Sequence, residues 1–297
     1  MYRDRSHVDP AYRDALRSVG LDGTEGVLRR VGDLLAAWSR STDTIRVDLA
    51  SRRFAVYVKR YHYPRWSHRL RGTLRGTFFG SSRARAEYVG LLRMRRLGMG
   101  VVRPIAFGER RVGHFVRSCW LITEAVPGAI SLDRFARNHI GRPPTPVTVR
   151  NVRQVLEGVG AEVRRVHDAG LLHGAMYWRN ILVRRGTGGR VEFYFLDAGK
   201  ARKIWLRPFR RWRQQGDIIS LAAGAVNYCT RTDLLRFLRG YWGVRRLDDS
   251  HRRWLQRMGP TVMRAAAAER LRIERGGVFD QYARNLAALA ADAPNDG

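Results

Sequence analysis

The fold of this chain is decided by a short loop, HGAMYWRN (residues 173–180), and by the residues that follow it. Two brief apolar runs, residues 181–183 and 191–196, are rich in β-branched and aromatic residues, which predicts two strands. Between them, GTGG (residues 186–189) predicts a hairpin turn, because glycine adopts the backbone angles that tight turns need. The second strand ends at Asp197 in the sequence LDAG. A loop, a hairpin and a terminal aspartate are thus predicted in succession.

The first half of the chain predicts a small antiparallel sheet with one helix. Residues 44–49 and 54–59 flank a polar turn and alternate between apolar and polar side chains, which predicts a β-hairpin. Residues 86–97 place their apolar side chains on one helical face. Short apolar runs at residues 101–107 and 115–123 predict two further strands.

The second half is predicted to be mainly helical. The helical segments are residues 131–139, 147–167, 217–228, 232–242 and 249–291. A small sheet followed by a helical region places the chain in the α+β class.

Composition excludes several classes of protein. The only cysteines, Cys119 and Cys229, have no partner motif, so neither a disulfide framework nor a zinc site is predicted, and a reducing, cytosolic setting fits. No signal-peptide core and no transmembrane run is expected from the sequence.

The formal charge of +30 attracts polyanions such as nucleic acid, acidic phospholipid or phosphorylated glycolipid. Arginine supplies nearly all of the positive charge. For any single arginine, a solvated position without a partner is as good an interpretation as contact with a polyanion.

Four positions in a fixed order indicate a protein-kinase-like phosphotransferase. Lys59 closes a strand, Glu87 lies in the following helix, Asn180 ends the loop and Asp197 ends the next strand. A lysine on a rigid strand can hold nucleotide phosphates while a helix-borne glutamate fixes its ammonium group. One carboxylate and one amide oxygen are suitable protein ligands for Mg²⁺, which retains several waters.

Three of these four residues also have a simpler explanation. Lys59 could be a solvated edge residue, Glu87 could pair with Arg83 along its helix, and Asp197 could form a turn before Ala198-Gly199. The order and spacing of the four together favour the phosphotransferase.

From about residue 45 to about residue 225 the chain resembles the bacterial lipopolysaccharide kinase family, which includes the Kdo and core-heptose kinases of the protein-kinase-like superfamily. The resemblance rests on YVKRY (57–61), TFFGSSRA (77–84) leading to Glu87, LG (97–98) with VRP (102–104), LITEAVPGAISL (121–132), AGLLHG (169–174) with NILV (180–183), and LDAGKAR (196–202). It implies a two-lobed protein-kinase-like fold with an antiparallel-sheet N-lobe containing one main helix.

The resemblance implies a division of the chain and a set of roles. The predicted parts are an N-terminal extension at 1–40, an N-lobe at 41–124, a hinge at 125–130 and a helical C-lobe at 131–297, together one kinase-like domain. In the extension, residues 33–38 suggest a short helix. ATP would be held by Lys59 and by backbone groups of Glu124 and Val126, and Mg²⁺ by Asn180 and Asp197. The implied catalytic set is Lys59, Glu87, His173, Asn180 and Asp197. Asp217 would brace the catalytic loop, although a helix-cap aspartate explains it equally well.

Two departures from the family pattern stand out. No glycine-rich phosphate loop is visible between Ile45 and Phe54. Ala175 stands two residues after His173, where kinase-like loops carry the aspartate that orients the acceptor hydroxyl. A positioned general base contributes roughly 10²- to 10⁴-fold, so its loss would slow catalysis without removing the other contributions. A substrate phosphate, Asp168 or Glu192 could replace it.

Two basic segments with interleaved aromatic residues are predicted to bind the acceptor or an anionic membrane. Residues 200–213 occupy the place of an activation segment, and residues 64–85 form the second segment. Their basic residues are Arg65, Arg69, Arg71, Arg75, Lys200, Arg202, Lys203, Arg207, Arg210, Arg211 and Arg213. Single-stranded nucleic acid would suit the same mixture, but no nucleic-acid module is recognisable and this partner ranks lower.

The leading hypothesis is an ATP- and Mg²⁺-dependent kinase of a sugar hydroxyl in lipopolysaccharide core or a related glycolipid, peripheral to the inner face of the cytoplasmic membrane. The second is a membrane-associated pseudokinase scaffold, which Ala175 motivates. The third is a polyanion-binding protein whose affinity falls steeply with salt.

Overall fold

The computed structural model describes residues 2–30, 34–39, 42–49, 54–63, 80–140, 146–204, 207–226 and 228–291. The chain divides into two compact units. The first contains Met1–Ala84, Ile105–Thr123 and Ala268–Gly297, and the second contains Arg85–Pro104 and Glu124–Ala267.

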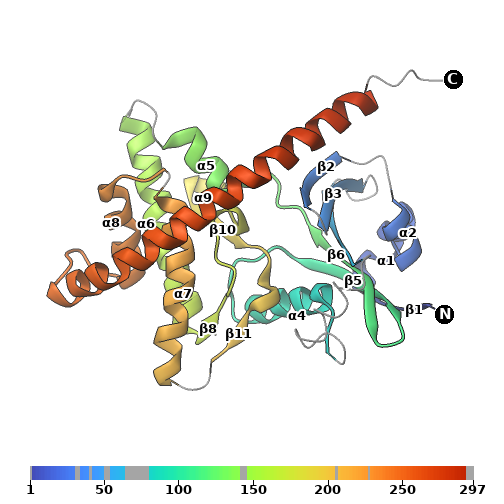
Figure 1. The fold of residues 1–297 in the computed structure, drawn as a ribbon, viewed down its shortest axis with the longest axis horizontal. Helices are drawn as coiled ribbons and strands as arrows, with labels where there is room; N and C mark the ends of the chain where they lie inside the picture. Colours follow the sequence, from blue (N-terminus) through green and yellow to red (C-terminus); the bar gives the residue numbers. More distant parts are fainter. Residues whose placement is uncertain are drawn as a thin grey trace. The chain divides into compact units, whose positions relative to one another are not determined.

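The first unit is built on a six-stranded sheet (Figure 1) in the order β1-β5-β6-β4-β3-β2. Its strands are β1 (Tyr2–Val8), β2 (Leu34–Ser39), β3 (Thr42–Leu49), β4 (Phe54–His62), β5 (Pro104–Val112) and β6 (Phe115–Glu124). β3 and β4 pair antiparallel, with Ile45 opposite Val58 and Val47 opposite Val56. All four residues are nearly inaccessible to solvent, because alternate residues of both strands face the same core. The predicted hairpin is therefore confirmed.

The N-terminal residues belong to this core. β1 pairs antiparallel with β5, and the short helices α1 (Arg13–Arg17) and α2 (Thr24–Arg29) follow it. Leu16, Leu21 and Val27 have no accessible surface and pack in one cluster with Trp120 of β6. The prediction of a peripheral extension is wrong for residues 2–30, because scattered leucines without a clear period did not reveal how closely these short elements pack.

The short helix predicted at residues 33–38 is also wrong. Residues 34–38 belong to β2, which pairs antiparallel with β3 and has a register shift between Leu35 and Ala37, and residue 33 lies outside the described residues. Leucine and alanine favour helix locally, but β3 offers backbone hydrogen-bond partners along its edge, and such a tertiary partner overrides a weak propensity.

A largely buried ion pair joins β3 and β4 to the α2 region. Asp43 accepts a hydrogen bond of 2.7 Å from Nε of Arg60, and its other oxygen lies 2.8 Å from Nε2 of His62. Burial alone would raise the pKa of Asp43, but the hydrogen bonds from His62 and Arg60 hold it below its usual value. Arg60 also donates to the carbonyl oxygens of Val27 and Arg30, so one guanidinium group ties the sheet to the segment that precedes β2.

The second unit is mainly helical, as predicted. Its helices are α4 (Arg83–Arg96), whose first two residues belong to the first unit, α5 (Leu132–His139), α6 (Pro146–Asp168), α7 (Arg207–Ala225), α8 (Arg231–Trp242) and α9 (Asp249–Ala291) as far as Ala267. Its short strands are β7 (Ile130–Ser131), β8 (Leu171–Leu172), β9 (Ile181–Arg185), β10 (Val191–Phe195) and β11 (Arg202–Lys203). β9 and β10 form the predicted hairpin. α7 begins at Arg207, ten residues before the predicted start.

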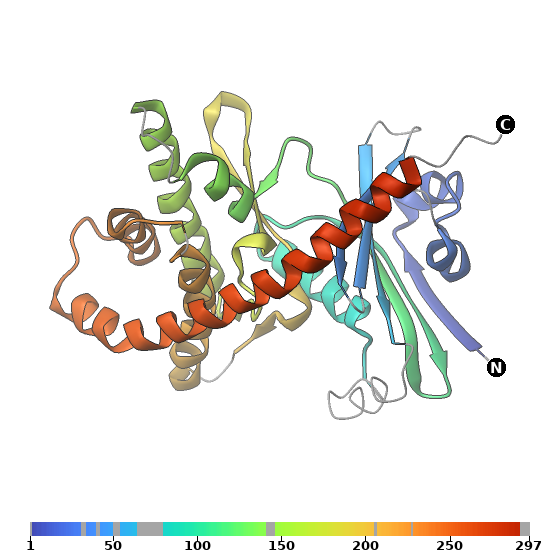
Figure 2. The same cartoon turned by 45° about the horizontal axis from the view of Figure 1, so that its top comes forward.

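Two close approaches organise this unit around α6 (Figures 1 and 2). A Cβ atom at Gly160 of α6 would stand 2.2 Å from the carbonyl oxygen of Phe237, and one at Gly240 of α8 would stand 2.0 Å from that of Glu157. On the same helix, Gly158 approaches the ring of Phe193 in β10 in the same manner. Glycine is therefore required where α6 meets α8 and β10, because any side chain would push the backbones apart.

Leu16→Ala is expected to lower the free energy of unfolding by about 2–5 kcal/mol, because it leaves a cavity in the core of the first unit. Urea denaturation followed by circular dichroism measures the loss. The matched control is Leu271→Ala, whose side chain is 53% exposed and whose effect should stay within about 0.5 kcal/mol. Equal effects of the two substitutions would contradict the assignment of residues 2–30 to the core.

Candidate active site

The loop of residues 173–180 is held by one buried carboxylate. The backbone N–H of His173 donates to Oδ2 of Asp217, and the N–H of Gly174 donates to Oδ1, both at 2.8 Å. Asp217 is 2% exposed and lies in the interior of α7, so it is not a helix cap. An ionised carboxylate that accepts two backbone N–H groups in a buried setting makes strong, directional bonds. Asp217 therefore fixes where the loop begins.

The start of the loop needs glycine. Gly174 has φ +75°, and a Cβ atom there would stand 2.8 Å from Cβ of Lys200. Beyond it, the N–H of Ala175 donates to Nδ1 of His173 at 3.3 Å. Burial lowers the pKa of His173, which agrees with a neutral imidazole whose Nδ1 is an acceptor. Ala175 itself is buried, and its methyl group stands at the position predicted for the missing aspartate.

Asn180 is oriented by the same loop. Its Nδ2 donates to the carbonyl oxygen of Ala175 at 2.9 Å, which fixes the amide plane and leaves Oδ1 on the opposite side. Its own carbonyl oxygen accepts from the N–H of Leu196 at 2.8 Å. The end of the loop is thereby tied to the residue that precedes Asp197.

Asp197 has an unusual backbone. Its φ of 54° and ψ of 45° are left-handed, and among the described residues no other non-glycine residue has a positive φ. The left-handed region is unfavourable for L-residues, although aspartate tolerates it better than most, and such residues concentrate at functional sites. The turn of residues 198–200 that follows redirects the chain immediately after the carboxylate.

Helix α4 packs directly on the segment after Asp197. A Cβ atom at Gly90 would stand 2.0 Å from the carbonyl oxygen of Ala198, and Nη1 of Arg93 donates to the carbonyl oxygen of Ala201 at 3.0 Å. Glu87 is 4% exposed, and its Cβ lies 3.6 Å from where a Cβ of Gly199 would be. The second unit therefore brings Glu87, Asn180, His173 and the Asp197 segment together.

Lys59 lies in the first unit, on β4 opposite Thr44. Its Nζ stands 5.2 Å from the centre of the Tyr61 ring, and the guanidinium carbon of Arg83 stands 5.8 Å from the same centre. Such contacts between a cation and an aromatic ring steady long side chains. Because Glu87 belongs to the second unit, the predicted pairing of Lys59 with Glu87 stays a prediction.

The predicted hinge has two backbone groups already in use. The N–H of Glu124 donates to the carbonyl oxygen of Arg103 at 2.9 Å, and the carbonyl oxygen of Val126 accepts from the N–H of Ala129 at 3.2 Å. These two bonds fix the backbone of the predicted adenine-binding segment.

The basic positions of the predicted activation segment lie partly on an exposed surface. Lys200, Arg202, Lys203, Arg211 and Arg213 are exposed, and Arg210 is half-buried. Trp212 between them is 66% exposed. The predicted basic residues Arg65, Arg69, Arg71 and Arg75, and the turn between β3 and β4, lie outside the described residues.

Neither of the two acids proposed to replace the base is directed to the loop. Glu192 accepts from Arg184 and from the hydroxyl of Tyr194 on the β9–β10 hairpin, and hydrogen bonds from Tyr194 and Arg184 lower its pKa. Asp168 is exposed and pairs with Arg164 at 3.3 Å. Both carboxylates are therefore engaged by neighbouring side chains, Glu192 within the β9–β10 hairpin and Asp168 within α6.

Sequence reasoning missed the residues that support Asp217. Nε2 of His167 lies 3.4 Å from Oδ2 of Asp217, and Nδ1 lies 2.9 Å from the hydroxyl of Tyr241. Burial raises the pKa of Tyr241 to about 12, so its hydroxyl stays protonated at neutral pH. Gln214 adds a bond of 2.8 Å to the carbonyl oxygen of His167. These residues lie far apart in the sequence, and no local pattern could have connected them.

In the part of the chain that the structure describes, no group of three or more histidine, cysteine, aspartate or glutamate side chains could hold a metal ion. No described helix is both long and apolar enough to cross a membrane.

Comparison with known proteins yields one family. Residues 35–241 match the model of the lipopolysaccharide kinase (Kdo/WaaP) family. The lipopolysaccharide core heptose(I) kinase WaaP of Escherichia coli strain K12 is 28% identical over 176 residues, which is 58% of this chain and 63% of that protein. WaaP of Pseudomonas aeruginosa is 29% identical over 163 residues, which is 54% of this chain and 59% of that protein. The chain thus spans just under two thirds of the length of the curated relatives it matches.

A solved structure described as WaaP in complex with acyl carrier protein shares the fold. It is 23% identical, covers 89% of this chain and 98% of its own, and gives a TM-score of 0.60. The predicted α+β, two-lobed protein-kinase-like fold is confirmed.

Asp217→Ala is expected to lower the free energy of unfolding by roughly 2–5 kcal/mol, because two buried N–H groups lose their acceptor. The amide protons of His173 and Gly174 should also exchange faster with solvent, which hydrogen-exchange mass spectrometry measures. Asp14→Ala, at a side chain that is 96% exposed, is the control and should change neither quantity. Unchanged exchange at the loop in Asp217→Ala would show that another group holds it.

Proposed function

Because the chain belongs to the lipopolysaccharide kinase (Kdo/WaaP) family, we propose that it is a kinase that uses ATP and Mg²⁺ to phosphorylate a sugar hydroxyl of lipopolysaccharide core or a related glycolipid. The observation that carries the proposal is the anchored pair of Asn180 and Asp197 on adjoining turns of one unit. The matched relatives are named as core heptose(I) kinases, which supports a sugar of the core as acceptor.

The residues present fit a magnesium ion. Oδ1 of Asn180 and the carboxylate of Asp197 are hard oxygen donors, and Mg²⁺ accepts one or two protein ligands together with waters and phosphate oxygens. The Asn180 amide cannot turn its nitrogen to the metal without losing its bond to Ala175. When bound, Mg²⁺ would neutralise charge on the phosphates.

The remaining positions would hold ATP. Lys59 would hold phosphate oxygens, and buried Glu87 would fix its ammonium group. Backbone groups of Glu124 and Val126 would meet the adenine edge. The fixed loop and strand backbones supply positioning, which is the main requirement of phosphoryl transfer.

Ala175 sets the expected rate. A methyl group cannot accept the proton of the acceptor hydroxyl, so the chain forgoes the roughly 10²- to 10⁴-fold that a positioned base contributes. Positioning and cation stabilisation are retained by Lys59, Asn180 and Asp197. We therefore propose a slow kinase.

The acceptor would bind at the exposed cations of residues 200–213. Lys200, Arg202 and Lys203 follow Asp197 directly, and exposed Trp212 stands among further arginines. Cations with interfacial aromatic residues suit a phosphorylated sugar or anionic lipid surface. Such a surface supports a place at the inner face of the cytoplasmic membrane.

Ala175 also favours a second candidate function, a kinase-like scaffold without phosphotransfer. The loop is complete without the aspartate, because the backbone of Ala175 bonds to both His173 and Asn180. A fold that keeps this geometry can present its basic surface without turnover.

Wild-type protein is expected to bind ATP only with Mg²⁺, and at ATP concentrations of about 100 times Kd this adds about 2.7 kcal/mol of stability. A thermal-shift titration measures it. Lys59→Ala and Asp197→Ala should lose the shift, whereas Asp249→Ala, at an exposed helix end, should retain it. A wild-type protein unaffected by millimolar ATP and Mg²⁺ refutes the kinase and leaves a polyanion-binding protein.

Ala175→Asp separates the kinase from the scaffold. In a slow kinase the new carboxylate is expected to raise kcat by roughly 10²- to 10⁴-fold, because it supplies the missing base. Phosphate transfer from radiolabelled ATP to lipopolysaccharide core gives the rate. If wild type binds ATP and only Ala175→Asp transfers phosphate, the natural chain is a scaffold.

A further inference from the structure

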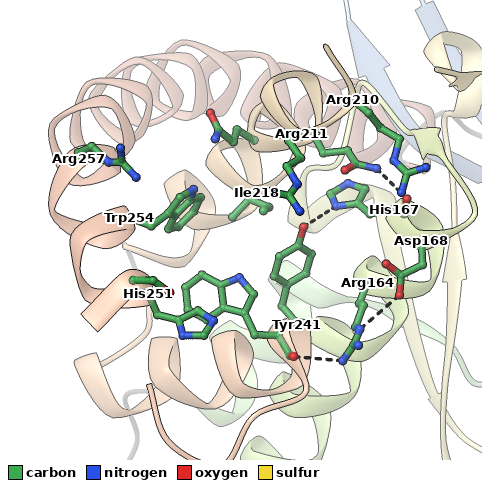
Figure 3. A pocket seen from close by; sticks show the side chains of 14 residues that line it. Arg164, His167, Asp168, Arg210, Arg211, Ile218, Tyr241, His251, Trp254 and Arg257 are labelled. Carbon is green, nitrogen blue, oxygen red and sulfur yellow. Dashed lines mark hydrogen bonds and ion pairs between the residues drawn. The ribbon is translucent and has the colours of Figure 1, made fainter. Parts of the chain in front are cut away.

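The second unit contains a cavity of about 1060 Å³ that none of the proposed ATP- and Mg²⁺-binding residues lines (Figure 3). Residues of α6, α7, α8 and α9 line it, all within that unit. Its size is sufficient for a small organic molecule, since ligand sites commonly enclose about 300–1,000 Å³.

The cavity is strongly cationic. Arg164, Arg210, Arg211 and Arg257 line it, and Asp168 is the one acidic side chain among the lining residues. Arg164 is occupied, because it donates to Asp168 at 3.3 Å and to the carbonyl oxygen of Trp242 at 3.1 Å. Among the described residues, no carboxylate forms an ion pair with Arg210, Arg211 or Arg257. Three guanidinium groups around one cavity therefore retain their charge for a ligand.

One wall of the cavity is aromatic. The rings of Trp242 and Trp254 meet edge to face, with centroids 5.5 Å apart and an interplanar angle of 88°. The centroid of the His251 imidazole lies 4.2 Å from the centroid of the Trp242 ring. Figure 3 shows Trp254 and Arg257 on the same side of the cavity. Aromatic side chains can stack on the apolar face of a ligand ring. Trp254 therefore offers a stacking surface beside the cationic group of Arg257.

The floor of the cavity is rigid. Tyr241 points to His167 in Figure 3, and its hydroxyl lies 2.9 Å from Nδ1 of that histidine, which in turn contacts Asp217. Arg164 is equally confined, because a Cβ atom at Gly243 would stand in contact with its guanidinium group. A site whose walls are already fixed loses little entropy when a ligand binds.

We propose that this cavity is a second ligand site, for a phosphate ester. Arg210 and Arg211 of α7 bind the phosphate, and the wall of Trp242 and Trp254 receives the organic part of the ligand, with Arg257 beside Trp254 donating to its polar groups. Guanidinium groups suit phosphate because their fork of N–H donors matches two phosphate oxygens. The site shares Arg210 and Arg211 with the proposed acceptor surface, but none of its residues belongs to the proposed ATP or Mg²⁺ site.

Isothermal titration with inorganic phosphate, glucose 6-phosphate and glucose tests the site. Glucose 6-phosphate is expected to bind, inorganic phosphate to bind more weakly, and glucose to show no binding. Arg211→Gln combined with Arg257→Gln should weaken glucose 6-phosphate binding by on the order of tenfold to a hundredfold, because each substitution removes a charged hydrogen-bond donor. Both side chains are exposed, so the fold should tolerate the change.

The matched control is Arg252→Gln combined with Arg253→Gln, which removes the same charge from exposed positions of α9 outside the cavity. It should bind within about twofold of wild type. Lys59→Ala should also bind the sugar phosphate normally, which separates this site from the proposed nucleotide site. No binding of any phosphate at about 10 mM, or equal weakening in both double variants, overturns the proposal.

Vesicles distinguish a lipid headgroup from a free phosphate ester as the ligand. Co-sedimentation with phosphatidylglycerol vesicles, but not with phosphatidylcholine vesicles, is expected if the phosphate belongs to a lipid, and the Arg211→Gln and Arg257→Gln pair should then reduce it. Binding of glucose 6-phosphate without cavity-dependent co-sedimentation identifies a free ester. Either result supports the site.

Discussion

The second unit depends on one interaction, the pair of hydrogen bonds that the Asp217 carboxylate accepts from the backbone of His173 and Gly174. A buried carboxylate is costly unless its oxygens are satisfied, and here they are satisfied by N–H groups that would otherwise be unpaired themselves. Each side of the contact thus needs the other. His167 and Tyr241 extend it to α8, so the loop is held by three helices and not by its own turn geometry.

The order of the site follows from that anchor. Once residues 173 and 174 are fixed, the loop closes on itself through Asn180, and the carbonyl group of Asn180 fixes Leu196 beside Asp197. The left-handed backbone at Asp197 is sustained by this framework and by α4, whose Gly90 lies against the following turn. None of these contacts involves a side chain of Ala175. The fold therefore does not require an aspartate at position 175, and in the proposed kinase only the handling of the acceptor proton would differ.

Much of the architecture was predictable, and the failures have physical reasons. The β3–β4 hairpin and helix α6 have strong periodicity, so local pattern was sufficient. Residues 2–30 form short elements without a sustained period, and their burial comes from packing on Trp120. β2 forms because β3 supplies its hydrogen bonds. α7 was placed ten residues late, because its first turns are rich in arginine and carry no apolar stripe.

The sequence by itself determined the family, the order of Lys59, Glu87, Asn180 and Asp197, and the substitution at Ala175, since these depend only on residue identity and spacing. Tertiary structure alone decided that Asp217 braces the loop and is not a helix cap. Its partners are the backbone N–H groups of His173 and Gly174, which lie 44 and 43 positions earlier in the chain. Tertiary structure also decided that arginines and tryptophans from four helices surround one cavity. A linear pattern records which groups a chain carries, whereas a binding site is defined by which of them packing brings within hydrogen-bonding distance.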